Sequence, residues 1–372
     1  MLAKGQTVIQ YMEQLAPKHV AEEGDKIGLQ LGSLQKEITG VLVALDVTDE
    51  VVEEAIAHGC NLIIAHHAII FRPIQQLQTD TPMGRLYEKL IKHDIAVYIS
   101  HTNLDVTEGG MNDWMAEALG ITEGVAPLKD IHTERLSKLV VFVPKSHHQQ
   151  VLDAVLNAGA GWIGNYSHCS FNIEGYGTFV PREGTDPFIG EQGKMERAEE
   201  VRIETIVPLG VRAKVIQAML KAHPYEEVAY DLYSMDLKGR SFGLGRVGRL
   251  KQPVSLAEFI ETVKKGLQVD QVRVVGDLNR TVSKAAVLGG SGGKFLQSAL
   301  FRGADVLVTG DIDYHTAQDA LMAGVALIDP GHNAEKIMKL KVAEWISGKL
   351  GEHKYATPVF ASAVNTEPFR FQ

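Results

Sequence analysis

The sequence predicts an α/β protein in which two related α/β halves form one unit around an inserted α+β domain. In both outer parts of the chain, short apolar runs alternate with amphipathic helical stretches, a pattern typical of parallel sheets. The middle of the chain shows a different order of elements, with strands that alternate polar and apolar residues. We expect a first half at residues 1–127, an insert at 128–238 and a second half at 239–372.

The first half contains apolar runs that fit strands buried on both faces, each followed by a helical stripe. Gly59 and Gly120 stand where two of these helices should end. Repeated strand–helix–strand order implies right-handed crossovers and a parallel sheet. The expected strands are residues 41–45, 61–65 and 95–100, and the expected helices are residues 7–16, 49–58, 84–92 and 111–119.

The last third repeats this plan. The Gly-rich segment Gly289–Gly293 follows its first strand, where backbone N–H groups could cradle an anion or the chain could turn tightly against other backbone. Its glycine spacing matches neither a Walker loop nor a dinucleotide-binding fingerprint. The expected strands are residues 285–288, 305–309 and 325–328, and the expected helices are residues 294–300, 316–322 and 333–350.

The middle segment has the order β-α-β-β-α-β, which is typical of a ferredoxin-like domain. Residues 176–200, rich in Gly, Pro and Glu, are expected to form a long excursion, and residues 243–248 a flexible return from the insert. We expect the segment His223–Glu227 to be solvated surface. The expected strands lie near residues 137–143, 169–173, 201–207 and 228–233, with helices at 147–158 and 211–222.

Bulk properties narrow the function. The 372 residues carry a net charge of −9, which disfavours direct nucleic-acid binding through a broad basic surface. No apolar run approaches the roughly 18 residues of a membrane span, and the start of the chain has no signal-peptide core. We therefore expect a cytoplasmic protein with no membrane contact. With only two cysteines, any metal site must use nitrogen and oxygen ligands.

Metal-ligating residue types stand where several predicted strands end. Because parallel strands present their carboxyl ends at one edge, these side chains are expected to meet there. Imidazole and carboxylate suit a borderline divalent ion, with Zn²⁺ expected first and Fe²⁺ or Mn²⁺ as alternatives. Five ligands exceed what one open catalytic ion needs and suit two ions per subunit. The predicted ligands are His66, His67, Asp105, His332 and Glu335.

Other polar residues lie at the same edge. His101 is a candidate catalytic group, with a role as an outer partner or in a turn as the alternative. Asp311 and His315 are candidate acid/base groups, but they and Asp313 could instead cap the following helix. Asp46 could make a turn or support a ligand. We expect a second adjacent histidine pair, residues 147–148, to be solvent-exposed.

These segments resemble the motifs of a known family, the GTP cyclohydrolase I type 2 homologues or Nif-three-like dinuclear-metal proteins. The resemblance covers both outer parts of the chain, and the insert is similar to PII- and CutA-type domains. One departure is that Glu335 follows His332 by three residues, where many relatives have four. The motifs are residues 25–30, 62–67, 100–105, 289–293, 309–311 with His315, and 329–332 with Glu335.

The resemblance implies a dinuclear metal site at the five ligands and a toroidal homohexamer. It also implies a metal-dependent hydrolase of nucleotide-type substrates, in the family's named case one that opens the guanine ring of GTP and releases formate. The alternative is a regulatory or metal-handling hexamer whose PII-like insert senses a small anionic or nucleotide ligand. A third hypothesis is a scaffold that influences transcription through partner proteins.

Overall fold

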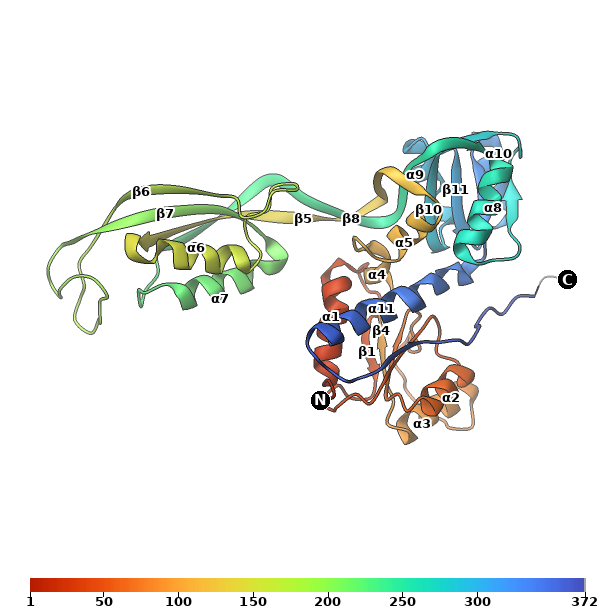
Figure 1. Ribbon diagram of the computed structural model, residues 1–372, viewed down its shortest axis with the longest axis horizontal. Helices are drawn as coiled ribbons and strands as arrows, with labels where there is room; N and C mark the ends of the chain where they lie inside the picture. Colours follow the sequence, from red (N-terminus) through yellow and green to blue (C-terminus); the bar gives the residue numbers. More distant parts are fainter. Residues whose placement is uncertain (371–372) are drawn as a thin grey trace. The chain divides into compact units, whose positions relative to one another are not determined.

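The computed structural model describes residues 1–370 and divides them into two units (Figure 1). One unit joins residues 1–132 to the residues from Phe242 onward, and the other is Thr133–Ser241. Two long strands, β5 (Ile121–Pro144) and β8 (Tyr230–Ser255), run from one unit into the other. The domain boundaries expected at 128 and 238 fall inside these strands and stay a prediction.

The first sheet lies in the first unit and contains five strands in the order β1-β4-β3-β2-β13. Every residue of its three central strands is buried, which explains their continuous apolar runs. These three strands and β13 are parallel, as predicted for 41–45, 61–65 and 95–100, while β1 is antiparallel. The strands are β1 (Gly28–Leu31), β2 (Val41–Ala44), β3 (Leu62–Ala65), β4 (Ala96–Ile99) and β13 (Val359–Ala361).

The second sheet of this unit continues from β8 in the order β8-β10-β11-β12-β9. Its strands β10, β11 and β12 are parallel, and β8 and β9 are antiparallel to their neighbours. The segment 243–248 lies within β8, so the prediction of a flexible return there is wrong: Arg246 pairs with Val287 across the sheet and is buried. The remaining strands are β9 (Arg273–Val275), β10 (Thr281–Ser291), β11 (Val306–Gly310) and β12 (Ala326–Asp329).

One layer of helices is shared by the two sheets. Because side chains alternate along a strand, Val41 and Val43 enter the central core, whereas Leu42 and Ala44 enter an outer core. The central core also contains the inward face of the second sheet, and its helices α1 and α11 lie side by side (Figure 1). The shared helices are α1 (Gly5–Leu15), α5 (Met111–Ala118), α8 (Leu256–Leu267) and α11 (Ile337–Glu352).

Other helices cover the outer faces of the two sheets. The helices α2 and α3 pack on the first sheet, and α9 and α10 pack on the second. Polar caps begin several of them: Thr48 and Thr81 accept hydrogen bonds at the starts of α2 and α3, and Asp313 does so at α10. Their bounds are α2 (Asp49–Ala57), α3 (Pro82–Lys92), α9 (Leu296–Phe301) and α10 (Tyr314–Ala323).

The second unit has the predicted order β5-α6-β6-β7-α7-β8. Its strands lie in the order β6-β7-β5-β8, and α6 and α7 pack together over a shared apolar core. The excursion spans only residues 180–195, because antiparallel pairing extends β6 and β7 beyond the predicted limits. The elements are α6 (His148–Asn157), β6 (Ser170–Phe179), β7 (Glu196–Pro208) and α7 (Arg212–Ala222).

The segment His223–Glu227 is solvated surface only in part: Glu226 and Glu227 are exposed, as expected, but the residues before them are not. His223 is buried, and its Nε2 lies 3.0 Å from the Phe142 carbonyl oxygen. The neighbouring Tyr225 donates a hydrogen bond to Glu200 at 3.0 Å. Pro224 does end the helix, but the chain then folds back onto the sheet, so these polar groups are satisfied by protein.

Among residues 1–370, no helix combines the length and the apolar character needed to cross a lipid bilayer.

Candidate metal centre

The polar cluster of the first unit forms where parallel strands of both sheets end. His66 and His67 follow β3, Asp105 lies in α4 (Thr102–Val106) after β4, and His332 and Glu335 follow β12. The structure brings all five predicted ligands together. Together with His101 they form three groups, and within each group the ligand atoms lie within 4.8 Å of one another. The groups are His66, His67 and His101; His67, His332 and Glu335; and His66, Asp105 and Glu335.

The adjacent histidines meet at one place because the strand ends at Ala65. The backbone N–H groups of His66 and His67 both donate to the carbonyl of Leu45, at 3.2 and 3.0 Å. In a regular strand the two side chains would point to opposite faces. The turn removes this alternation, so that the two rings lie with their centroids 5.0 Å apart.

The His332–Glu335 pair lies on a 3₁₀-helix, η5 (His332–Lys336), and not on the predicted long helix from residue 333. The α-helix begins only at Ile337. In a 3₁₀-helix, residues three apart eclipse each other, so the three-residue spacing directs both side chains to the same point. The Nε2 atom of His332 lies 3.3 Å from Oε2 of Glu335.

Glu335 is central to the cluster. Its Oε2 atom lies 3.2 Å from Nε2 of His67 and 3.8 Å from Nε2 of His66, in addition to its contact with His332. The side chain is almost fully buried, although it comes from the second half of the chain. A single carboxylate therefore faces three imidazoles, a set of donors that suits a divalent metal ion.

His66 provides the clearest test of whether a metal fits. The ring is fully buried, and its Nδ1 lies 2.9 Å from the Ser100 carbonyl oxygen, which assigns the proton to Nδ1 and leaves the Nε2 lone pair facing the cluster. Burial lowers the pKa of His66 to about 3, so the ring is neutral. Nε2 of His66 and Oδ1 of Asp105 are both buried and without a hydrogen-bond partner among residues 1–370. Two such lone pairs 3.7 Å apart suit a bound cation.

Carboxylates outside the cluster fix three further rings. Nδ1 of His67 lies 2.6 Å from Asp46, and Nδ1 of His332 lies 2.6 Å from Asp311. Nδ1 of His101 lies 2.9 Å from Asp25. Such outer partners set the tautomer of a ligating histidine and hold its other nitrogen toward the ion.

The same contacts shift the pKa values of residues in the cluster. Burial alone would lower the pKa of His67, but hydrogen bonds to Asp46 and Glu335 raise it to about 10. The pKa of His332 is raised to about 9, first by its hydrogen bond to Glu335. Burial, together with the nearby charge of Glu335, raises the pKa of Asp105 well above its usual range. The carboxylates around His67 and His332 thus favour a bound positive charge at these rings, either a proton or a metal ion.

The Gly-rich segment of the second half packs directly against this cluster. A Cβ atom on Gly290, which has φ +64°, would lie 2.7 Å from Oε1 of Glu335 and 3.2 Å from Nε2 of His332. A side chain there would displace the predicted ligands. Of the two alternatives for Gly289–Gly293, close backbone packing accounts for the glycine at 290.

The structure separates the candidate catalytic residues. His101 joins the cluster, and its ring centroid lies 5.0 Å from that of His66. Within residues 1–370, the contact of Asp311 with the cluster runs through His332. His315 is exposed on the first turn of α10, where its backbone N–H donates to the cap Asp313 and its ring meets Tyr314. A catalytic role for His315 finds no support in these contacts and stays a prediction.

Asp46→Asn is expected to weaken Zn²⁺ binding by about 10- to 100-fold, because it removes the carboxylate that orients His67. The measurement is competition with a chromophoric chelator. Asp49→Asn is the matched control: Asp49 is an exposed acid three residues away that pairs with Lys89, and its loss should leave Zn²⁺ affinity unchanged. Equal affinities for the two variants would contradict the role given to Asp46.

Two supporting groups were missed by sequence reasoning. Asp25 lies in an irregular segment before β1, yet it accepts hydrogen bonds from both the backbone N–H and the hydroxyl of Thr102 as well as contacting His101. The Ser100 carbonyl that fixes His66 carries no side-chain signal at all. The one sequence signal for Asp25 was its place in residues 25–30, a segment that resembles a motif of the family.

Comparison with known proteins agrees with this architecture. The family Duf34/NIF3 (NGG1p interacting factor 3) matches residues 3–368. A GTP cyclohydrolase 1 type 2 homolog of Halalkalibacterium halodurans is 55% identical, covering 100% of this chain and 99% of that protein. The corresponding homolog of Bacillus subtilis is 52% identical, covering 99% and 98%.

Solved structures agree as well. The crystal structure of a Bacillus cereus protein related to NIF3 superposes with a TM-score of 0.94 at 51% identity and covers 100% of both chains. A Staphylococcus aureus protein superposes with a TM-score of 0.77 at 32% identity, covering 100% of this chain and 99% of that one. With its strand-end cluster of histidines and acids and this match along nearly its whole length, the chain belongs to the DUF34/NIF3 family.

Proposed function

We propose that this protein is a hydrolase that binds two divalent metal ions per subunit and acts on nucleotide-type substrates. The observation that carries the proposal is the pair of buried lone pairs without partners, Nε2 of His66 and Oδ1 of Asp105, which face each other beside Glu335. Groups of this kind are costly to bury unless they bind a cation.

Two ions account for the number of donors better than one. His66, His67 and Glu335 each belong to two of the three groups, so that one ion alone would leave several donors unused. Glu335 belongs to two of the groups and is the residue of the second half that would help to hold metal in both. A pair of divalent ions supplies Lewis acidity and lowers the pKa of a bound water molecule. The proposed ligands are His66, His67, Asp105, His332 and Glu335, and the proposed ion is Zn²⁺, with Fe²⁺ or Mn²⁺ as alternatives.

The protein's own groups would supply the remaining chemistry. His101 is held by Asp25 and lies next to the predicted ligands, so it is placed to hold or move a proton. Asp311 orients His332 and is itself exposed, so it can face substrate. GTP is the first substrate to test because similar proteins are named GTP cyclohydrolase 1 type 2 homologs. We propose further that the protein acts as a cytoplasmic homohexamer, as the resemblance implies.

The test is incubation of the protein, loaded with Zn²⁺ or Mn²⁺, with GTP and separately with generic phosphodiesters. Release of formate from GTP would support ring opening, and release of phosphate without formate would point to a phosphoesterase. His67→Ala should abolish either activity. His148→Ala is the matched control, since it alters the second residue of the other His-His pair, which is partly exposed on the inserted unit.

Absence of turnover on every substrate with two bound ions would contradict the hydrolase proposal. A ligand-dependent change confined to the inserted unit would then favour the regulatory alternative. Equal activity of His67→Ala and the parent protein would show that any measured turnover does not depend on the cluster.

A further inference from the structure

The inserted unit contains a cavity of about 590 Å³ that the proposed hydrolase does not use. This volume is within the range of small-molecule pockets, roughly 300–1,000 Å³. Strands β5, β6 and β7, the excursion 180–195 and the segment after α7 all contribute to its wall. Every lining residue belongs to Thr133–Ser241, so the cavity is complete within this unit.

Aromatic rings form part of the wall. The Tyr225 ring stands between two phenyl rings, with centroids 6.1 Å from that of Phe179 and 6.3 Å from that of Phe188. In both pairs the rings are inclined to each other, so the wall offers both ring faces and ring edges to a ligand. Phe188 is half exposed on the excursion, which leaves one side of the wall accessible. Such a wall accommodates a flat or compact apolar group.

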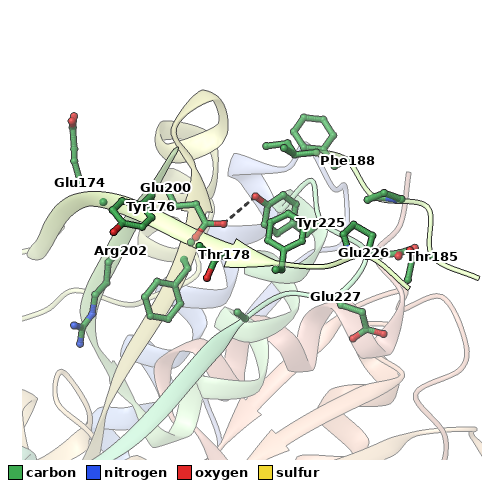
Figure 2. Close-up of a pocket in the computed structure, with 18 of the residues that line it drawn as sticks. Glu174, Tyr176, Thr178, Thr185, Phe188, Glu200, Arg202, Tyr225, Glu226 and Glu227 are labelled. Carbon is green, nitrogen blue, oxygen red and sulfur yellow. Dashed lines mark hydrogen bonds between the residues drawn. The ribbon is translucent and has the colours of Figure 1, made fainter. Parts of the chain in front are cut away.

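A buried carboxylate lies among these rings. Glu200 is only 9% exposed, and its Oε1 atom accepts a hydrogen bond of 3.0 Å from the Tyr225 hydroxyl. Figure 2 shows Glu200 and Tyr225 directed toward one another. The second oxygen lies over Gly177, where a Cβ atom would come within 2.3 Å of it. A glycine at 177 therefore makes room for this carboxylate, and a phenol is the partner that the wall gives it.

The charge of the wall is acidic. Four glutamates and one arginine line the cavity: Glu174, Glu200, Glu226, Glu227 and Arg202. The guanidinium of Arg202 is paired with Glu204 at 2.8 Å and points away from Glu200 and Tyr225 (Figure 2). The one arginine of the wall is thus paired with Glu204, which does not line the cavity. The buried carboxylate of Glu200 lies beside aromatic rings and has no cationic partner from the wall. Anions are disfavoured here, and an ammonium group satisfies both features.

An arrangement of the same kind occurs at the rim of this wall. The Arg197 guanidinium lies 3.5 Å from the centre of the Tyr176 ring, on a residue that also lines the cavity. Cation–ring contact of this kind is favourable, and more so when water is excluded. The interior of the cavity offers rings together with a carboxylate, so it should bind a cation more strongly than this rim contact.

We propose that this cavity binds a small organic cation, an amine attached to an apolar body about the size of one aromatic ring. The ammonium group would pair with the Glu200 carboxylate, and the apolar body would lie between Tyr225, Phe179 and Phe188. This ligand class is opposite in charge to the anionic or nucleotide ligand expected for the insert from resemblance. The proposal is independent of the metal centre.

Calorimetric titration of the full chain with three compounds of similar shape tests the proposal: phenethylamine, phenethyl alcohol and phenylacetate. Phenethylamine should bind at least about tenfold more tightly than the other two, because only it can form a charge-assisted bond to Glu200. Phenylacetate binding as tightly as the amine would overturn the proposal. So would the absence of saturable phenethylamine binding in the millimolar range.

Substitutions of lining residues test whether phenethylamine binds in this cavity. Glu200→Gln keeps a hydrogen-bonding side chain and should weaken phenethylamine binding by about tenfold or more. Glu199→Gln is the control, because Glu199 is the exposed neighbour on the same strand and should leave binding unchanged. If Glu200→Gln does not fold, Phe188→Ala serves instead: it removes a half-exposed ring and should weaken amine binding several-fold. Unchanged binding in the folded variants would refute the assignment.

Discussion

Replacement of Glu335 by Gln is expected to reduce Zn²⁺ binding from two ions per chain to one or none. Glu335 belongs both to the group with His67 and His332 and to the group with His66 and Asp105, so this carboxylate would serve both proposed ions. Gln keeps the shape of the side chain but lacks the negative charge. Loss of an outer partner of a metal ligand typically weakens metal binding by about 10- to 100-fold. We expect the Zn²⁺ affinity of this variant to fall by more than that. Elemental analysis after dialysis and competition with a chelator measure both quantities.

The control for this variant is Glu344→Gln. Glu344 is exposed on α11, the helix that follows η5, and should have no effect on bound metal. Far-ultraviolet circular dichroism would verify that both variants are folded. If Glu335→Gln retained two ions with parental affinity, the cluster would not be the metal site.

Replacement of Arg246 by Ala is expected to lower the free energy of unfolding of the first unit by about 3–5 kcal/mol. All five N–H donors of this buried guanidinium are used. Two bond to the Asp113 carboxylate at 2.6 and 2.7 Å, and three bond to the backbone carbonyls of Gly243, Gly245 and Thr107. Alanine would leave a carboxylate and three carbonyls without their partner.

Denaturant unfolding followed by tryptophan fluorescence measures this effect, since Trp114 directly follows Asp113. Arg246→Lys should recover only part of the stability, because an ammonium group cannot match the planar bidentate contact. The control Arg249→Ala changes an exposed residue of the same strand and should stay within about 0.5 kcal/mol of the parent. A loss below about 1 kcal/mol for Arg246→Ala would contradict this assignment.

The Arg246 contacts also connect stability to the metal centre. Thr107, whose carbonyl accepts from Arg246, lies two residues after Asp105, and Asp113 lies in the first turn of the next helix, α5. Arg246 comes from the strand β8, more than a hundred residues later in the chain. The sequence pattern at 243–248 indicated only a flexible segment, because glycines in an alternating strand look the same as glycines in a loop. Close packing against Leu128 and Val287 explains Gly245.

Long-range pairing explains the other elements that sequence reasoning missed. The strand β13 joins the first sheet beside β2, although it comes from the end of the chain. It has only three residues, each partly exposed, and so lacks the apolar run that revealed β2 and β3. The short antiparallel strands β1 and β9 give equally weak signals for the same reason.

Local chemistry was enough for most of the architecture. Runs such as Leu62–Ala65 are apolar because both faces of the strand are buried, and that requirement is written directly in the residues. The residue types at the strand ends also predicted the cluster, although Asp313 at the same edge caps a helix instead. The sequence by itself therefore determined the α/β class, the order of the inserted unit and the five proposed ligands.

Only the tertiary structure decided how those ligands meet and what supports them. His67 and Glu335 are 268 residues apart in the chain, and Asp25 supports His101 across 76 residues. The cavity around Glu200 likewise depends on Tyr225 folding back from the end of α7. Such contacts depend on how sheets and helices pack in three dimensions. Hydrophobic periodicity along the chain predicts the elements but not which distant side chains become neighbours.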